Sequence, residues 1–447
     1  MATMSRPALD VSVQAARDPM RAAFFWLSAF YIVYCVRPED WIPGLKYVPL
    51  AKITGICAFL ALLASINKAK RSFRHLPKEG YYLLTIICLM YASALLSPVW
   101  KGGALMRTID FSKMFVAWVL TYLVVTDFQK LRRIIFIQAG AVSIIAVISM
   151  IKGRGHERLE GVLGGIYSNP NDLAFAIVLS LPFCLAFLVT AKGAMKKIGW
   201  LLAMLAMLLT LFMTASRGGF IDLVVSSVVS LWYFGVKGRR FYLILAAAFF
   251  GTLLMAVAGG KLKDRFLAVS GEGIDTQLEN RAYGSFEERR YLMVKALEAM
   301  VEYPVLGIGV RNFTNYSGIW KEVHMSYLQI GVEAGIPAMI LYMLFFARGF
   351  RNLRLIRRRK HLDPQIILFS GALTSSLVGF VVGALFSPEA YQFFPYFAVA
   401  FTSALIAMIT EGEQSGEAPQ PKSSGTVVSG WLAANTKKNE PEPVFPR

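Results

Sequence analysis

The chain is dominated by apolar segments that are long enough to cross a lipid bilayer. Crossing the hydrocarbon core as a helix takes about 20 predominantly apolar residues. Because backbone polar groups in lipid must be paired within the protein, a chain of this kind folds as a helical bundle. The sequence therefore predicts an all-α integral membrane protein with about twelve transmembrane helices. The predicted spans are 22–36, 48–66, 81–98, 111–126, 132–151, 171–191, 197–214, 219–236, 241–259, 324–347, 365–387 and 392–410.

Composition agrees with a membrane protein. Hydrophobic residues make up 56% of the 447 residues and charged residues only 17%, which is too apolar for a soluble protein of this length. The N-terminal stretch MATMSRPALDVSVQAARDPMR is polar, so no cleavable signal peptide is expected. The cysteines lie within or beside spans and are expected to be small core residues rather than a disulfide or metal set. They are Cys35, Cys57, Cys88 and Cys184.

Basic residues are unequally divided between the two sets of loops that alternating spans create. The inner loops carry 21 Lys and Arg residues, edges included, and the short outer loops carry 8. This bias places both termini in the cytoplasm. The net charge of +19 then requires no nucleic acid, and the basic runs KAKRSFR and RNLRLIRRRK are expected to bind anionic lipid headgroups. The inner loops are 67–80, 127–131, 192–197, 237–240 and 348–361, and the outer ones are 37–47, 99–110, 152–170, 215–218 and 388–391.

These features divide the chain into four parts. Residues 1–259 form an N-terminal membrane region with nine spans, and residues 324–410 form a C-terminal one with three. Between them lies an external loop, 260–323, whose length is typical of a functional or a disordered segment. Residues 411–447 are rich in Pro, Ser, Gly and Glu and are expected to be a disordered cytoplasmic tail.

The external loop is predicted to contain an amphipathic helix. Ser285 and Glu288 fit a capping box that opens the run SFEERRYLMVKALEAMVEYP. One face carries the polar residues, and the opposite face should lie on the outer membrane surface, with Arg289 and Arg290 turned toward the lipid or the bundle. The polar face is Glu287, Tyr291, Lys295, Glu298 and Glu302, and the apolar face is Met293, Val294, Leu297, Met300 and Val301.

Charged and polar residues gather at the outer level. Arg217 lies in the tight turn ASRGG, where Gly218 and Gly219 would allow close approach of a ligand, and His324 stands at the start of the tenth span. Asn171 opens the sixth span and could hydrogen-bond a sugar or cap its helix. The alternative to ligand binding is that each of these basic side chains only extends into the lipid headgroup layer.

The planar guanidinium group of arginine can donate two parallel hydrogen bonds, like a fork, to the oxygens of a phosphate or diphosphate. A lipid-linked diphosphate at the outer leaflet is therefore the expected ligand. Acidic metal motifs and phosphate-binding glycine loops are not evident, and neither a metal nor another cofactor is expected. Arg154, His156 and Arg158 are expected to contact headgroups, and Glu333 is expected to be a buried, paired structural carboxylate.

Three motifs in order resemble a known family. SRGG, then ERRYLMVKALEAMVEYPVLGIGVRNF, then VHMSYLQIGVEAGIPAMILYM are similar to the O-antigen ligase and polymerase superfamily of bacterial envelopes, and YCVRPEDWIPGL resembles its exosortase-associated O-glycosylation ligases. The resemblance implies transfer of a glycan from undecaprenyl diphosphate to an acceptor hydroxyl on the periplasmic face of the inner membrane. It implies catalytic roles for Arg217, Arg289 and His324. The sequence departs from the family at Met293, where tryptophan is common, and at Met325, where asparagine is usual.

The resemblance also frames the possible mechanism and its rivals. Arg217 and Arg289 would stabilise the leaving diphosphate, with Arg290 and Asn171 as further substrate-binding residues. His324 would be either a general base or a diphosphate ligand. The acceptor could be lipid A core, a growing glycan or a protein, so a ligase, a polymerase and a protein O-oligosaccharyltransferase all fit. A lipid-linked oligosaccharide flippase and a non-catalytic scaffold are the rivals from other classes.

Overall fold

A computed structural model describes residues 18–153, 158–161, 165–260, 263–264, 267, 276–359 and 361–414. Among these residues the regular elements are helices and no strand is found. The long helices are α1 (Arg21–Val36), α3 (Leu50–Ala64), α4 (Lys78–Leu96), α5 (Lys101–Val124), α6 (Phe128–Lys152), α7 (Pro170–Thr190), α8 (Ala194–Thr214), α9 (Arg217–Leu231), α10 (Tyr242–Ala258), α12 (Thr276–Glu302), α15 (Ile336–Arg358), α16 (Pro364–Gly383) and α17 (Phe393–Gln414). The short ones are α2 (Pro38–Trp41), α13 (Phe313–Tyr316), α14 (Ser326–Ala334), the 3-10 turns η1 (Leu45–Tyr47), η2 (Ile66–Lys68) and η3 (Phe73–His75), and the π-helical turn η4 (Trp232–Val236).

The all-α membrane-type fold is confirmed, whereas the count of about twelve spans is not. Each predicted span coincides with one helix or, for 324–347, with two, but only seven helices in the described part of the chain are long and apolar enough to cross a bilayer. They are α4, α6, α7, α8, α9 with η4, α16 and α17. The apolar helices α3 and α10 are shorter than a full crossing requires.

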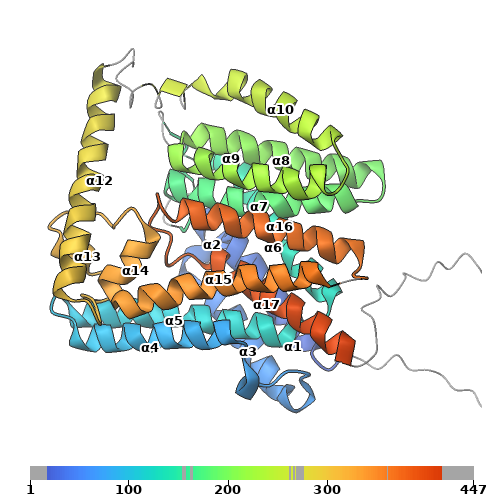
Figure 1. Cartoon of the computed structure of the whole chain (residues 1–447), viewed down its shortest axis with the longest axis horizontal. Helices are drawn as coiled ribbons and strands as arrows, with labels where there is room; N and C mark the ends of the chain where they lie inside the picture. Colours follow the sequence, from blue (N-terminus) through green and yellow to red (C-terminus); the bar gives the residue numbers. More distant parts are fainter. Residues whose placement is uncertain are drawn as a thin grey trace, which may run out of the picture.

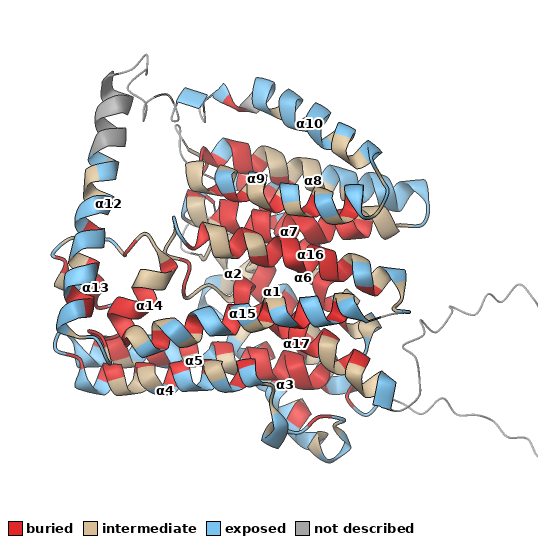
Figure 2. Cartoon of the chain, in the orientation of Figure 1, coloured by how far each residue is buried: buried red, intermediate tan, exposed pale blue. Residues whose placement is uncertain are grey.

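The helices form a layered bundle around α7, α16 and α17 (Figure 1). These three helices are largely enclosed by protein, whereas α10 has no buried residue among those described (Figure 2). Helix α7 contacts α6, α8, α9 and α16, so its apolar side chains are covered on all sides. A helix that is apolar all round belongs in the centre of a membrane bundle, and this is where α7 lies.

The predicted tenth span, 324–347, is wrong as a single helix. Gly335 (φ +90°) separates the nine-residue α14 from α15, and Pro337 follows in the first turn of α15. A Cβ at position 335 would lie 2.0 Å from the backbone oxygen of Val305, so only glycine fits where the two segments meet. At about 1.5 Å per residue, α14 is too short to span. His324 therefore precedes a short buried helix rather than a transmembrane one.

Hydrogen bonds connect loops that were predicted to lie on the same side. At one end, Ser97 Oγ donates to the Ile308 oxygen (2.6 Å) and the Ser326 nitrogen donates to the Ala384 oxygen (2.8 Å). At the other end, Arg71 Nε lies 2.6 Å from Glu411 Oε1. Figure 1 shows α12, α13 and α14 gathered at the first end and the C-terminal end of α17 at the second. We call the first the loop end, and the helices alternate between the two ends.

The basic runs do more than face lipid headgroups. The Arg71 side chain is only 4% exposed and also donates to the Tyr122 oxygen (2.7 Å), so the headgroup role expected for it is wrong. Arg357 Nη1 likewise donates to Thr374 Oγ1 (2.8 Å). Arginine offers several donors, and these residues use them to tie helix ends together. Helix α17 extends to Gln414, past the predicted boundary at 410, and residues 415–447 lie outside the described residues.

Helix α12 crosses the loop end of the bundle (Figure 1), and its predicted start at Ser285 is wrong. It begins at Thr276, so Ser285 lies inside the helix and does not cap it. The buried face is Leu292, Ala296, Ala299 and Met300, which pack with α13 and α14. Most of the predicted apolar face is exposed, namely Met293, Val294, Leu297 and Val301. The small alanines allow close packing against α14, which decides the rotation of the helix.

The cysteine prediction is partly confirmed. The four cysteines are free, and Cys35 and Cys184 are buried in the bundle. Cys88 is exposed on α4, so it is not a core residue of the bundle.

The orientation of the bundle can be tested by cysteine labelling. Trp320 is 86% exposed at the loop end, and Met195 is 87% exposed at the start of α8 at the other end. We expect Trp320→Cys to react with a membrane-impermeant maleimide in intact spheroplasts, and Met195→Cys to react only after the membrane is opened. The unsubstituted chain measures the background from the native cysteines. Labelling of Met195→Cys alone in intact spheroplasts would reverse the proposed orientation.

Candidate functional site

The loop end carries two helix starts that are joined by Asn171. Asn169 is the N-cap of α7 and Ser216 is the N-cap of α9. Asn171 Oδ1 accepts from Ser216 Oγ and from Arg158 Nη2, both at 2.8 Å. Asn171 therefore does not cap its helix, and this one of the two roles that the sequence suggested is wrong. It instead cross-links α7, α9 and the segment before α7.

Arg158 belongs to this cross-link and not to the headgroup layer. Its Nε atom donates to the Thr214 oxygen (3.0 Å), in addition to its bond with Asn171. This corrects the expectation that Arg158 contacts lipid headgroups. Arg154 and His156, for which the same role was expected, lie outside the described residues.

Arg217 is the first residue of α9 and lies half-buried at the loop end. Backbone N–H groups in the first turn of a helix lack partners within the helix and favour an anion, so the cation stands beside an anion-attracting end. Gly219 serves packing rather than ligand approach, because a Cβ there would lie 2.7 Å from the Ala174 Cβ on α7. A Cβ at Gly218 would lie 3.8 Å from Phe386, in the loop between α16 and α17.

Arg289 and His324 are close enough for the charge of the arginine to act on the imidazole. His324 is half-buried just before α14, and Arg289 is an exposed residue of α12. Burial, followed by the nearby positive charge of Arg289, lowers the pKa of the His324 imidazole to about 4. Lys321 Nζ and Glu288 Oε2, 2.6 Å apart, form an ion pair next to them. The imidazole is therefore neutral at pH 7 and can accept a proton or a hydrogen bond.

Arg290 does not join Arg289. Its side chain is 68% exposed, and Nη1 lies 3.9 Å from Glu287 Oε1 on the same helix. Successive residues on a helix point about 100° apart, which explains why the charge of Arg289, and not that of Arg290, acts on the His324 imidazole.

The loop 384–392 connects the Arg217 turn with the Arg289–His324 pair. Ser326, two residues after His324, is held from both sides: its Oγ donates to the Ser387 oxygen (2.7 Å), and the Glu389 nitrogen donates to the same Oγ (2.9 Å). On its other side the loop carries Phe386 beside Gly218. The structure thus places Arg289 within electrostatic reach of His324, and this loop connects the segment that follows His324 with the turn that carries Arg217.

A second polar cluster lies under the same loop, and the sequence analysis did not assign it. Arg311, in the left-handed region (φ +56°), forms an ion pair with Glu322 (3.4 Å) and stands 5.6 Å from the centre of the Tyr391 ring. The Tyr391 hydroxyl donates to Glu333, which is fully buried. Glu333 is thus a buried, paired carboxylate, as expected. Arg311 lies within the quoted GVRNF run, but a loop arginine has no periodicity to mark it.

Glu389 adds a buried carboxyl group to this cluster. It is almost completely enclosed, and Ser387 Oγ donates to its Oε1 atom (2.7 Å). Burial, and then the neighbouring carboxylate of Asp172 at the start of α7, hold the pKa of Glu389 well above its ordinary value. A protonated Glu389 can share a proton with Asp172 and so join α7 to the loop.

One comparison with known proteins gave a match. Residues 202–343 match the family model described as O-antigen ligase. The matched range runs from α8 into α15 and contains Arg217, Arg289 and His324. It confirms the resemblance that the three motifs indicated. Neither a curated protein nor a solved structure was found to match the chain.

Proposed function

We propose that this chain, whose residues 202–343 match the family model described as O-antigen ligase, is a glycan ligase of the bacterial inner membrane. It transfers a glycan from an undecaprenyl-diphosphate-linked donor to an acceptor hydroxyl. The termini lie in the cytoplasm and the loop end faces the periplasm. The proposal is supported by the half-buried His324, whose imidazole lies within reach of the charge of Arg289, and by the loop 384–392, which contacts both Ser326 and the turn that carries Arg217.

The arginines would act on the leaving group. Breaking the bond between the anomeric carbon and the diphosphate oxygen leaves both electrons on that oxygen, so negative charge grows during the reaction. Arg217, at the start of α9, and Arg289, on α12, can donate to these oxygens as forks, and the first turn of α9 favours the same charge. Donors fixed in place before the reaction stabilise such charge strongly. Arg290, exposed on α12, would meet the diphosphate only as it approaches.

His324 would act on the acceptor. The acceptor oxygen forms the new bond to the anomeric carbon from the side opposite the leaving diphosphate, which inverts the configuration there. Its proton passes to the neutral imidazole of His324, which is available because the ring is uncharged near pH 7. Since Asn171 Oδ1 is already engaged, a sugar would be contacted by the amide nitrogen of that residue. The proposed reaction uses neither a metal nor a cofactor.

Glycolipid and glycoprotein profiling of a deletion strain tests this proposal. We expect one acceptor class to lose its glycan while the lipid-linked donor accumulates on the periplasmic face. Loss from lipid A core, shortened glycan chains or loss from a protein would identify a ligase, a polymerase or a protein O-oligosaccharyltransferase, respectively. Accumulation of the donor on the cytoplasmic face would instead indicate a flippase and would contradict the proposal.

A further inference from the structure

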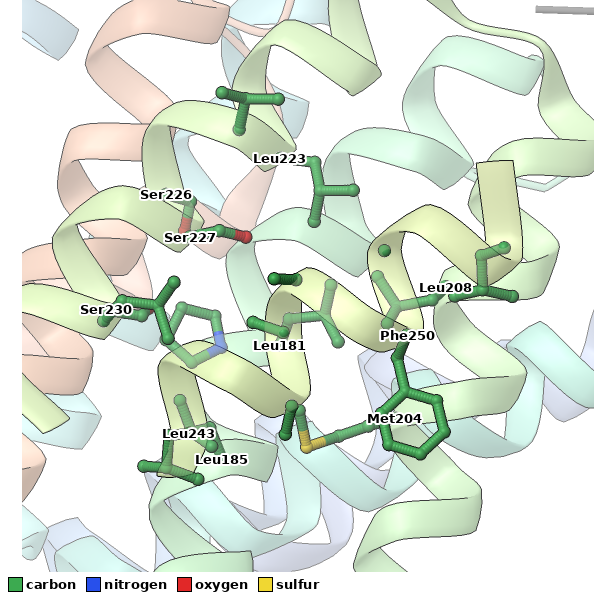
Figure 3. A pocket seen from close by; sticks show the side chains of 18 of the residues that line it. Leu181, Leu185, Met204, Leu208, Leu223, Ser226, Ser227, Ser230, Leu243 and Phe250 are labelled. Atoms are coloured by element: carbon green, nitrogen blue, oxygen red, sulfur yellow. The ribbon is translucent and has the colours of Figure 1, made fainter. Parts of the chain in front are cut away.

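An apolar groove of about 540 Å³ runs between α7, α8, α9 and α10. Figure 3 shows Leu181 and Leu185 from α7, Met204 from α8 and Phe250 from α10 turned toward it, with three serines of α9 along one wall. Its volume is within the range of sites that hold small molecules, about 300–1,000 Å³. The walls thus favour a long apolar ligand over a polar one.

The groove is held open by a loosely attached helix. Helix α10 contacts α8 and η4, and none of its described residues is buried. It lines the groove with large apolar residues such as Phe250 and also with four small ones, Ala246, Ala247, Ala248 and Gly251. A Cβ at Gly251 would meet no atom within 4 Å, so this position borders open space. Small residues on a helix otherwise allow close packing, but here they leave room between helices.

One end of the groove lies next to the turn that carries Arg217. Phe212 and Phe220 line the groove, and their ring centroids are 6.0 Å apart. They precede and follow the tight turn between α8 and α9, so Arg217 stands close to the end of the groove. At the other end the groove reaches Leu231 and Leu243, near the opposite ends of their helices. The groove therefore extends away from the cation along the direction of the helices.

We propose that this groove holds the polyprenyl chain of the lipid-diphosphate donor while its diphosphate rests at Arg217. The inference rests on the proposed function and adds the path of the lipid. A ligand with an anionic head and a long apolar tail matches a cation placed at the end of an apolar channel. The contact of the tail with α7, α8, α9 and α10 sets the depth at which the diphosphate stops, beside the start of α9.

Filling the groove should distinguish long donors from short ones. In purified full-length chain, we expect Gly251→Phe to raise the KM for the undecaprenyl-linked donor by about tenfold or more, because several methylene groups lose their apolar contacts. The same glycan diphosphate on a short prenyl chain should be used with an unchanged KM. Gly199→Phe is the matched control, since Gly199 on α8 also borders open space but does not line the groove. Equal effects of the two variants, or equal effects on the two donors, would overturn the proposal.

Photo-crosslinking tests binding without transfer. A polyprenyl diphosphate that carries a diazirine near the end of its chain should label peptides of α8 and α10, and undecaprenyl phosphate should suppress the labelling. Equal suppression by phosphatidylglycerol would show a groove for any lipid chain and would refute the donor assignment. If the photoreactive lipid labels the groove but the protein transfers no glycan, the groove assignment is supported and the proposed function is refuted. The two failures can therefore be told apart.

Discussion

Arg217→Lys is expected to lower the transfer rate by about 10²–10³-fold, the range observed when one preorganised donor to a developing anion is removed. Lysine keeps the positive charge at the start of α9 but loses the planar fork that can hold two diphosphate oxygens at once. Rate is measured as glycan transferred per enzyme in proteoliposomes. Protein abundance and thermal stability should stay near those of the unsubstituted chain, because Arg217 is half-buried at a helix end.

Arg290→Lys is the matched control for this variant. Arg290 is also an arginine at the loop end, but its side chain is 68% exposed and its charge is not among those that shift the pKa of His324. Its replacement should change the rate much less than Arg217→Lys does. If Arg217→Ala transfers glycan as fast as the unsubstituted chain, the diphosphate does not bind at Arg217, and both the leaving-group mechanism and the proposed donor path would be wrong.

The helices were predictable because their signal is local. Apolar segments of about 20 residues have few alternatives in a membrane, so all of the predicted spans correspond to helices. The break between α14 and α15 was also visible, as Gly335 followed by Pro337, but the apolar run across it looked continuous. A glycine in an apolar helix is often tolerated, and only the approach of Val305 shows that this one ends the helix.

The candidate site residues could be predicted only where they lie in a motif that resembles a known family. Arg289 and His324 are 35 positions apart in sequence, and no periodicity relates them; their proximity depends on how α12 packs over α14. That packing uses Ala296 and Ala299, small residues that the amphipathic pattern did not select. Likewise, Arg71 and Arg158 are indistinguishable by sequence from interfacial arginines, since their partners are a carboxylate and carbonyl oxygens in distant segments.

His324 gives the proposed mechanism a distinctive pH dependence. In the donor-free enzyme its pKa is about 4, because burial and then the charge of Arg289 disfavour the protonated ring. The neutral form therefore predominates above that pH, and kcat/KM, which reports the free enzyme, should fall only as the pH approaches 4. A bound diphosphate offsets the charge of Arg289 and favours protonation of the imidazole. The acid limb of kcat, which reports the bound complex, should therefore lie at higher pH than that of kcat/KM.

The substitution His324→Gln separates a base from a diphosphate ligand. Glutamine can still donate a hydrogen bond, but it cannot take a proton near neutral pH, so loss of a general base should reduce kcat by about 10²–10⁴-fold. Donor binding, measured with the photoreactive polyprenyl diphosphate, should be almost unchanged, because the proton leaves the acceptor only in the transition state. The acid limb assigned to His324 should disappear from the residual activity. A variant that binds the donor weakly but turns over normally at saturation would instead make His324 a diphosphate ligand. Normal transfer at normal abundance would leave it as a headgroup-layer residue at the start of α14.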